Sequence, residues 1–142
     1  MTGNEFSADI SRFIAKVGIA ADKFMFDLGQ EIGEAVVRST PVDTGHLRRS
    51  WTANIGSPDT TYMAGEPRPT VAVPTASADA MSRIVAQLLG VRGGDTIYYN
   101  NNVHYGPYVE FGTQHQRAQY FVRDTVSRLD SIAERVANKH RV

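Results

Sequence analysis

Cysteine is absent from this sequence of 142 residues. Its absence excludes disulfide bonds and thiolate metal sites, and it suits a protein made in a reducing cytoplasm. Long apolar runs are also missing, since no segment approaches the roughly 20 apolar residues that span a bilayer. Residues 1–5 show neither the basic nor the apolar region of a signal peptide. We therefore expect no signal peptide and no membrane partner.

Net charge is missing as well. Fifteen Lys and Arg balance fifteen Asp and Glu, which gives a formal net charge of +0. Because affinity for DNA rests mostly on neutralising phosphates, this balance argues against a protein whose main task is to grip DNA. It also removes long-range repulsion between identical copies and so tolerates self-association. The length predicts one domain, residues 1–142, with a core that needs no disulfide or metal.

Known catalytic and ligand-binding motifs are lacking. The four histidines belong to no His-Glu-x-x-His or Cys/His motif, and no nucleophile elbow, P-loop or dinucleotide fingerprint is present. His104, Glu110 and His115 are close in sequence, but their spacing fits no helical face and favours polar loop residues over a metal site. Glu110 stands among aromatic residues without a second acid, which favours a salt bridge or an amide-binding role over catalysis. We expect no catalytic residue, no metal and no cofactor.

Helical periodicity is strong at the start of the chain. Apolar residues recur at steps of three and four from Phe6 to Val36, which predicts a long amphipathic helix that Pro41 ends. Gly18, Gly29 and Gly33 each weaken this helix by up to ~1 kcal/mol relative to Ala, or else allow another element to approach closely. We expect a stripe this long to leave part of its apolar surface for another chain.

A turn and a strand are predicted next. In the segment Pro41–Gly45, the Asp43 carboxylate can accept a hydrogen bond from the backbone and Gly45 can take a positive φ. The run His46–Ile55 places its apolar residues at a period of two, with Arg49 the exception on that face. These are Leu47, Trp51, Ala53 and Ile55. The pattern predicts a half-buried strand with the Trp51 ring in the core.

The middle of the chain alternates between loops and short elements. Residues 56–69 are rich in Gly and Pro and predict a long loop or an extended arm. Residues 71–73 predict a short strand that Pro74 closes. Residues 77–89 predict a helix, with Ser77 as its N-cap and Gly90 just after its end.

The last third predicts a strand, a turn and two helical segments. Residues 95–100 have high β propensity, and Asn100–Asn102 predicts a turn. Tyr105–Phe111 predicts one helical turn, and residues 120–139 predict a final helix. The apolar stripe of that helix is Val122, Val126, Leu129, Ile132 or Ala133, and Val136.

The order of elements predicts an α+β fold. A small antiparallel sheet should pack against the long N-terminal helix and the C-terminal helix. A sheet of three or four strands has free edges, which an assembly can pair or cover.

Three segments together resemble a known family. They are 40–51 (TPVDTGHLRRSW), 94–101 with 104–113 (GDTIYYNN and HYGPYVEFGT), and 119–126 (QYFVRDTV). Their order resembles that of the tail-component family of lambdoid and related siphophages, which includes minor tail protein Z-like and tail-completion proteins. The resemblance covers roughly residues 5–140. The chain departs from the family pattern at Gly106-Pro107 and in the proline-rich stretch 65–69.

The resemblance implies a structural virion protein at the head–tail junction. Such proteins complete the tail or join it to the head as oligomeric rings, usually hexameric, around the DNA channel, and they have no catalytic activity. Implied partners are further copies of the chain, a head–tail adaptor, tail terminator or tail tube protein, and DNA that passes through without sequence specificity. The implied location is the virion neck or tail, with assembly in the host cytoplasm.

The resemblance also marks the residues that should build or assemble this protein. They are Asp43, Thr44, Gly45, Leu47, Arg48, Trp51, Tyr99, Asn100, Tyr105, Tyr108, Glu110, Phe111, Gly112 and Arg123.

Two alternatives of other classes stay open. In a DNA-contacting adaptor or terminator module, several arginines would line a lumen. They are Arg48, Arg49, Arg68, Arg83, Arg92, Arg117 and Arg123. In a small hydrolase, Glu110 would act with His104 or His115.

Overall fold

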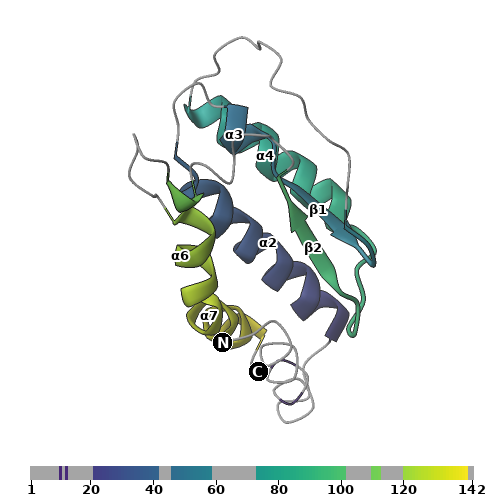
Figure 1. Ribbon diagram of the computed structural model, residues 1–142. Coiled ribbons are helices and arrows are strands. Elements are labelled where there is room, and N and C mark those ends of the chain that lie inside the picture. Colours follow the sequence, from purple (N-terminus) through teal and green to yellow (C-terminus); the bar gives the residue numbers. More distant parts are fainter. Residues whose placement is uncertain are drawn as a thin grey trace.

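The structure is a computed structural model. It describes Ile10, Arg12 and residues 21–41, 46–58, 73–101, 110–112 and 120–140. Helix α2 (Ala21–Ser39) runs through the middle of the described part (Figure 1). It forms the second half of the helix predicted from Phe6 and ends two residues before Pro41. Of the first half, Ile10 and Arg12 are described and helical, and the rest lies outside the described residues.

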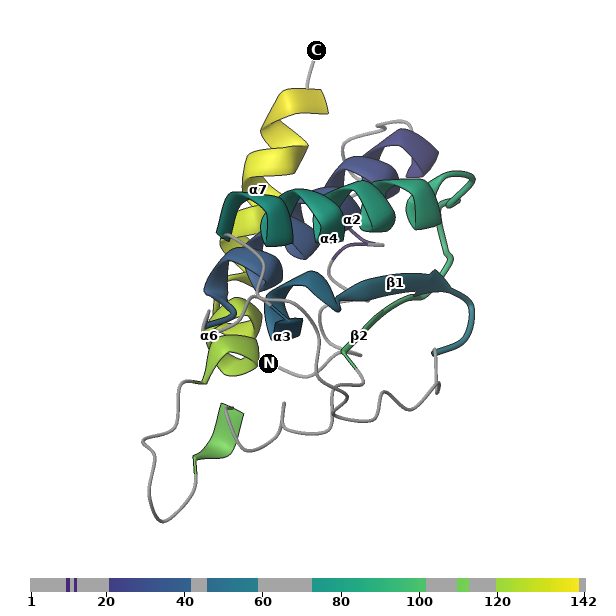
Figure 2. The ribbon, with the colours of Figure 1, turned by 90° about the horizontal axis from the view of Figure 1, so that it is seen from above.

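Two groups of elements pack on different sides of α2 (Figures 1 and 2). One group contains the short helix α3, helix α4 and strands β1 and β2, and the other contains helices α6 and α7. Their bounds are α3 His46–Arg49, β1 Thr52–Ile55, α4 Val73–Leu88, β2 Ile97–Asn100, α6 Phe121–Ser127 and α7 Leu129–His140. The described helices thus surround α2, which explains why its sequence is apolar on more than one side.

The sheet consists of two antiparallel strands. Thr52 lies opposite Asn100, and Ile55 lies opposite Ile97. The predicted α+β fold is confirmed, with a small antiparallel sheet packed against helices. Within the described residues the sheet has two strands, fewer than the three or four expected from the sequence.

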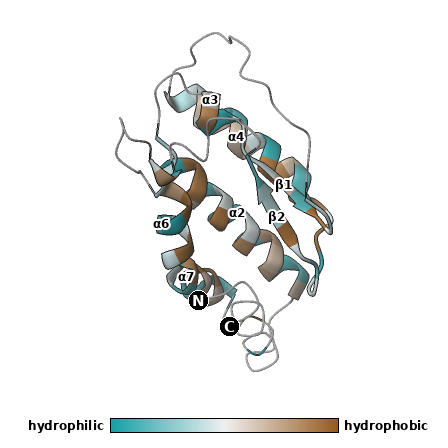
Figure 3. Cartoon of the chain, viewed as in Figure 1, coloured by the Kyte–Doolittle hydropathy of each residue, from teal (hydrophilic) through white to brown (hydrophobic). Residues whose placement is uncertain are grey.

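Two clusters of buried side chains share α2. One joins α2, α3, β1, α4 and the start of α6, and it includes Trp51 and Phe121. The other joins α2 to α7 through Phe24, Leu28 and Val136. Figure 3 shows these apolar segments on the helices. No large apolar side chain of α2 is among the exposed ones, so its described part lacks the free apolar surface expected from the long stripe.

Two glycines of α2 permit close packing, which is the second of the two roles considered for them from the sequence. A Cβ atom on Gly29 would lie 3.0 Å from the Cδ1 atoms of both Ile97 and Leu88. A Cβ atom on Gly33 would lie 3.0 Å from Ile84 Cγ2. Both α4 and β2 therefore rest on the glycine face of α2, and the helix propensity lost at these positions is offset by contact.

The strand predicted over His46–Ile55 is wrong in its first half. His46–Arg49 forms helix α3, and the strand begins only at Thr52. Leu47 and Trp51 are nevertheless both buried, as expected. A step of four residues fits a helical face and a strand face equally well, so the apolar pattern could not separate the two.

The strand predicted at 71–73 is wrong at Val73, whereas 71 and 72 lie outside the described residues, and the N-cap predicted at Ser77 is also wrong. Helix α4 begins at Val73, which places Pro74 in its first turn and Ser77 inside the helix. Proline is tolerated in a first turn because the N–H that it lacks would have no helical partner there. Gly90 follows α4 with φ +86, which confirms it as the residue after the helix end.

The predicted C-terminal helix is two helices. It breaks at Arg128, and the break changes which face is buried. Ile132 and Val136 are buried as predicted, but in α6 the buried residues are Phe121 and Thr125. Val122 and Val126, expected on the buried stripe, are exposed, because the stripe was drawn as if the helix were continuous.

Candidate functional site

A buried threonine marks the end of α2. The Thr40 side chain is 0% exposed, and its hydroxyl donates a hydrogen bond to the Val36 carbonyl at 2.7 Å. The same hydroxyl accepts a hydrogen bond from the Trp51 indole N–H at 2.8 Å. Because a buried indole N–H needs an acceptor, Thr40 fixes where the ring can lie.

Arg48 completes this group, which we call the Thr40 junction (Thr40, Arg48 and Trp51). Its guanidinium donates to the Thr40 carbonyl from Nε at 3.1 Å and from Nη2 at 2.8 Å. Nη2 also donates to the Arg38 carbonyl at 3.0 Å, and Nη1 to Ser77 Oγ at 3.3 Å. The cation thus caps the open carbonyls at the C-terminus of α2 and ties them to α4. Burial lowers the pKa of Arg48 from its usual value.

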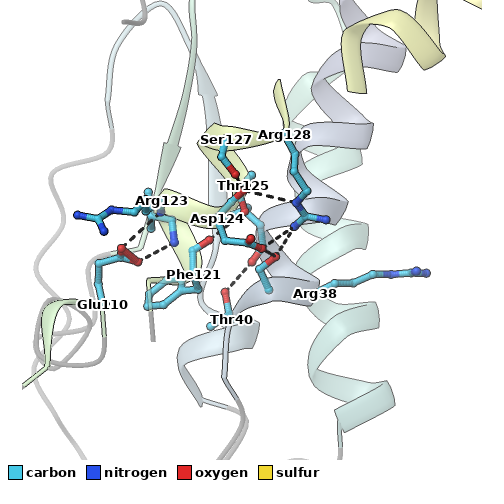
Figure 4. Close-up of polar contacts among 12 residues, drawn as sticks. Arg38, Thr40, Glu110, Phe121, Arg123, Asp124, Thr125, Ser127 and Arg128 are labelled. Atoms are coloured by element: carbon cyan, nitrogen blue, oxygen red, sulfur yellow. Dashed lines mark hydrogen bonds and ion pairs between the residues drawn. The ribbon is translucent and has the colours of Figure 1, made fainter. Parts of the chain in front are cut away.

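Trp51 connects the Thr40 junction to helix α6. Its ring lies edge-on to Phe121, the first residue of α6, with 6.3 Å between ring centroids. Residues at the end of α2 bind α6 as well, since Arg128 Nη2 donates to Ser39 Oγ at 2.6 Å and pairs with Asp124 at 3.1 Å (Figure 4). Trp51 therefore contacts the start of α6, while Ser39 binds Asp124 within α6 and Arg128 just after it.

The motif residues on and just after β2 form hydrogen bonds with neighbouring elements. The Tyr99 hydroxyl donates to the Gly29 carbonyl at 2.5 Å, and burial raises the pKa of this hydroxyl well above its usual value. The Asn100 amide donates to Asn54 Oδ1 at 3.2 Å, across the two strands. Asn101 Nδ2 donates to the Leu47 carbonyl at 2.7 Å. These bonds fasten β2 to α2, β1 and α3.

Glu110 caps α6 from outside the helix. Its carboxylate is buried and accepts hydrogen bonds from the backbone N–H groups of Val122 at 2.6 Å and Arg123 at 3.4 Å (Figure 4). The preceding residue, Tyr120, has φ 48 and provides no side-chain cap. A negative charge at a helix N-terminus is favourable. The amide-binding interpretation of Glu110 is confirmed.

Four exposed apolar side chains flank this cap: Phe111 follows Glu110, Tyr120 precedes α6, and Val122 and Val126 lie one turn apart on α6. The exposed fractions are 70% for Phe111, 38% for Tyr120, 37% for Val122 and 42% for Val126. We call these residues the α6 face. The Arg123 guanidinium lies 4.2 Å from the centroid of the Tyr120 ring, a cation–π contact that leaves the face partly cationic. Gly112 follows with φ +82, where a side chain would be strained.

Four of the described arginines of this set contact groups of their own chain. Arg48 is used in the junction, and Arg83 Nη1 donates to the Arg49 and Trp51 carbonyls at 2.6 and 3.0 Å. Arg49 lies 4.0 Å from Asp79, and Arg123 covers Tyr120. Arg68 and Arg117 lie outside the described residues. The arginine-lined lumen considered from the sequence therefore stays a prediction.

Several predicted site residues lie outside the described part of the chain. They are Asp43, Thr44, Gly45, Tyr105 and Tyr108, together with His104 and His115. Within the described residues, no group of three potential metal ligands occurs and no helix is long and apolar enough to cross a membrane.

Thr40 is the residue whose importance the sequence did not reveal. The sequence marks it only as the residue before Pro41 and the first residue of the motif 40–51. A threonine at a helix end, followed at eleven residues by the single tryptophan, is the signal that could have indicated an indole acceptor. Ser77, expected as a helix cap, also belongs to this hydrogen-bonded group.

Comparison with known proteins gives one match. The family described as "Bacteriophage HK97-gp10, putative tail-component" matches residues 4–112. The match includes the Thr40 junction, the sheet and Glu110, and it ends before α6. No curated protein and no solved structure is similar enough to this chain to count as a match.

Proposed function

Because the chain belongs to the HK97-gp10 family of bacteriophage tail components, we propose that it is a structural protein of the phage neck. Copies of it form a ring, six-fold to match the tail, around the DNA channel. The ring completes the tail or joins it to the head, and it contacts an adaptor, a terminator or the tail tube. As a tail component the protein is part of the virion.

The α6 face carries this proposal. Four of the five large apolar side chains that are exposed among the described residues lie on it. A clustered apolar surface on a small domain marks an association site. The partly desolvated pair of Tyr120 and Arg123 has the composition that is enriched at protein interfaces. We propose that the α6 face is one of the two different patches that a closed ring requires.

The motif residues support a framework role. Thr40, Arg48 and Trp51 direct their polar atoms to carbonyls and hydroxyls of their own chain. Both carboxylate oxygens of Glu110 accept from backbone amides. We propose that these residues set the positions of helices and take part in no reaction.

The α6 face can be tested in assembled particles. Phage that lack this chain would be supplied with a Val122→Ser, Val126→Ser double variant, and its copies per particle would be counted. We expect a large loss, because two exposed apolar contacts are removed while the folded core is untouched. The control is Ser131→Ala on the exposed side of α7. Normal incorporation of the double variant would remove the α6 face from the proposal.

A further inference from the structure

The two edges of the small sheet differ in their protection. The outer edge of β1 is covered by α4, because the Ala53 N–H donates to Gln87 Oε1 at 2.8 Å. Just before β1, Arg83 occupies the carbonyls of Arg49 and Trp51. Side chains of α4 therefore bind one outward N–H of β1 and the two carbonyls just before the strand.

The outer edge of β2 has no such cover. Since the Ala53 N–H points to Gln87, Ala53 and Tyr99 form a non-hydrogen-bonded pair, and the pattern of an antiparallel ladder alternates from there. The bond from the Gly56 N–H to the Thr96 carbonyl at 2.8 Å fits this alternation. The N–H and C=O groups of Ile97 and Tyr99 therefore point away from β1. In the part of the chain that the structure describes, these four groups have no hydrogen-bond partner.

The β2 edge is also rigid and uncharged. Ile97 lies against the glycine face of α2, and the Tyr99 hydroxyl is bonded to Gly29, so the strand cannot turn away. The strand Ile97–Asn100 contains neither a charged residue nor proline. Natural sheet edges are usually blunted by Lys, Pro or a bulge, because unpaired strand groups bind other strands. The ligand that matches two N–H and two C=O groups at alternate residues is an extended polypeptide.

We propose that the β2 edge binds an extended strand from a second copy of this chain, as the receiving half of the contact between ring neighbours. This inference rests on the proposed ring. The strand is assigned to the arm predicted from sequence, because residues 59–72 connect the described Pro58 to α4 and can reach about 45 Å when extended. Within it, residues 60–64 (TTYMA) have β propensity and no charge. Neighbouring copies with a net charge of +0 do not repel one another.

A matched pair of proline variants tests the edge. Ile97→Pro removes an N–H that faces outward and leaves the β1 ladder intact, whereas Ile55→Pro does the same on the covered edge directly opposite. Folding of each is checked by circular dichroism and Trp51 fluorescence. We expect Ile97→Pro to reduce incorporation into phage particles about tenfold or more relative to Ile55→Pro. Equal incorporation of the two variants would overturn the inference. If either variant still forms rings in the particle, the proposed function stands whatever the outcome for the β2 edge.

A lysine pair decides the question if Ile97→Pro fails to fold. Tyr98 and Asn54 lie opposite each other, with side chains on the sheet face away from α2. Tyr98→Lys places a charge at the open edge, and Asn54→Lys places it at the covered edge. We expect only Tyr98→Lys to reduce incorporation.

Cross-linking identifies the source of the strand. Because the chain has no cysteine, single Tyr98→Cys and Tyr62→Cys variants can be mixed during assembly and treated with a short bifunctional maleimide. A product of two chains supports a strand from a second copy. A variant that carries both cysteines is treated in the same way. A cross-link within one chain of that double variant, or no cross-link in assembled particles, would overturn the inference. A single isolated copy in the unmodified particle would reject the ring itself.

Discussion

At the scale of single residues, the most informative is Thr40. Its one hydroxyl serves as a donor to the carbonyl of Val36 and as an acceptor for the Trp51 indole. Both partners are in the core, so neither can turn to water if the hydroxyl is lost. The position therefore demands a small side chain that carries an oxygen at a helix end.

Replacing Thr40 tests this demand directly. Thr40→Val keeps the shape and leaves the buried indole N–H unsatisfied, so we expect a loss of about 1–3 kcal/mol in the free energy of unfolding. Thr40→Ser keeps the hydroxyl and should lose clearly less. Urea unfolding followed by Trp51 fluorescence gives both values. Equal stability of the valine variant and the original protein would reject the hydrogen-bonding role.

The capping role of Arg48 depends on the forked shape of its guanidinium group. Its three nitrogens reach two carbonyls and Ser77, and a single ammonium group cannot make all of these bonds. We expect Arg48→Lys to lower the free energy of unfolding by about 1–3 kcal/mol. Arg38→Lys is the control, because that side chain is 75% exposed and holds only a surface pair with Glu34. Similar losses in the two variants would contradict the capping role.

Glu110 should matter for stability and not for chemistry. Glu110→Gln keeps an oxygen that can accept from Val122 and removes the charge at the start of α6, so we expect a loss of about 0.3–1 kcal/mol. Glu110→Ala removes both acceptors and should lose more. Thermal unfolding of the two variants checks the order. A hydrolytic activity of the original protein that Glu110→Gln abolishes would overturn the non-enzymatic proposal.

At the scale of elements, the apolar pattern predicted some segments well and failed at others for definite reasons. Helix α2 was predictable because its steps of three and four persist over 19 residues. Helix α3 was not, because the step from Leu47 to Trp51 fits both periods. The break at Arg128 carries no glycine or proline, so nothing in the local sequence marked it.

At the cap of α6, the sequence predicted the kind of role that Glu110 has but not its partners. The isolated carboxylate of Glu110 indicated a salt bridge or amide binding, and the structure shows amide binding. Its partners, the N–H groups of Val122 and Arg123, follow only from the fold, because they lie 12 and 13 residues away. Likewise, the sequence showed the motif 40–51 but not that Thr40 and Arg48 close the end of α2.

At the scale of the whole molecule, α7 is attached to α2 by an apolar cluster and by charges at its rim. Arg135 and Lys139 pair with Glu31 at 2.9 and 3.0 Å, and the hydrogen bond from Lys139 is the main cause that lowers the Glu31 pKa. Because these side chains are partly exposed, the buried residues Ile132 and Val136 contribute most of the attachment. The described helices thus pack on one another, and we propose that contacts with other chains use the α6 face, the β2 edge and the arm.

The predicted arm provides a test at this scale. Deleting residues 58–68 should leave a folded monomer, because no described core side chain is removed. We expect the deleted chain to assemble poorly, because the strand offered to its neighbour is gone. Circular dichroism reports folding, and the number of copies per particle reports assembly. Normal assembly of the deleted chain would show that the arm is not a contact.

The most direct test of the proposed function is an electron cryomicroscopy map of the phage neck. It should be resolved well enough to count copies of this chain and to trace their contacts. We predict a closed ring around the DNA channel, with head-to-tail contacts that include the α6 face or the β2 edge. One isolated copy, or a ring whose contacts avoid the α6 face, the β2 edge and the arm, would contradict it.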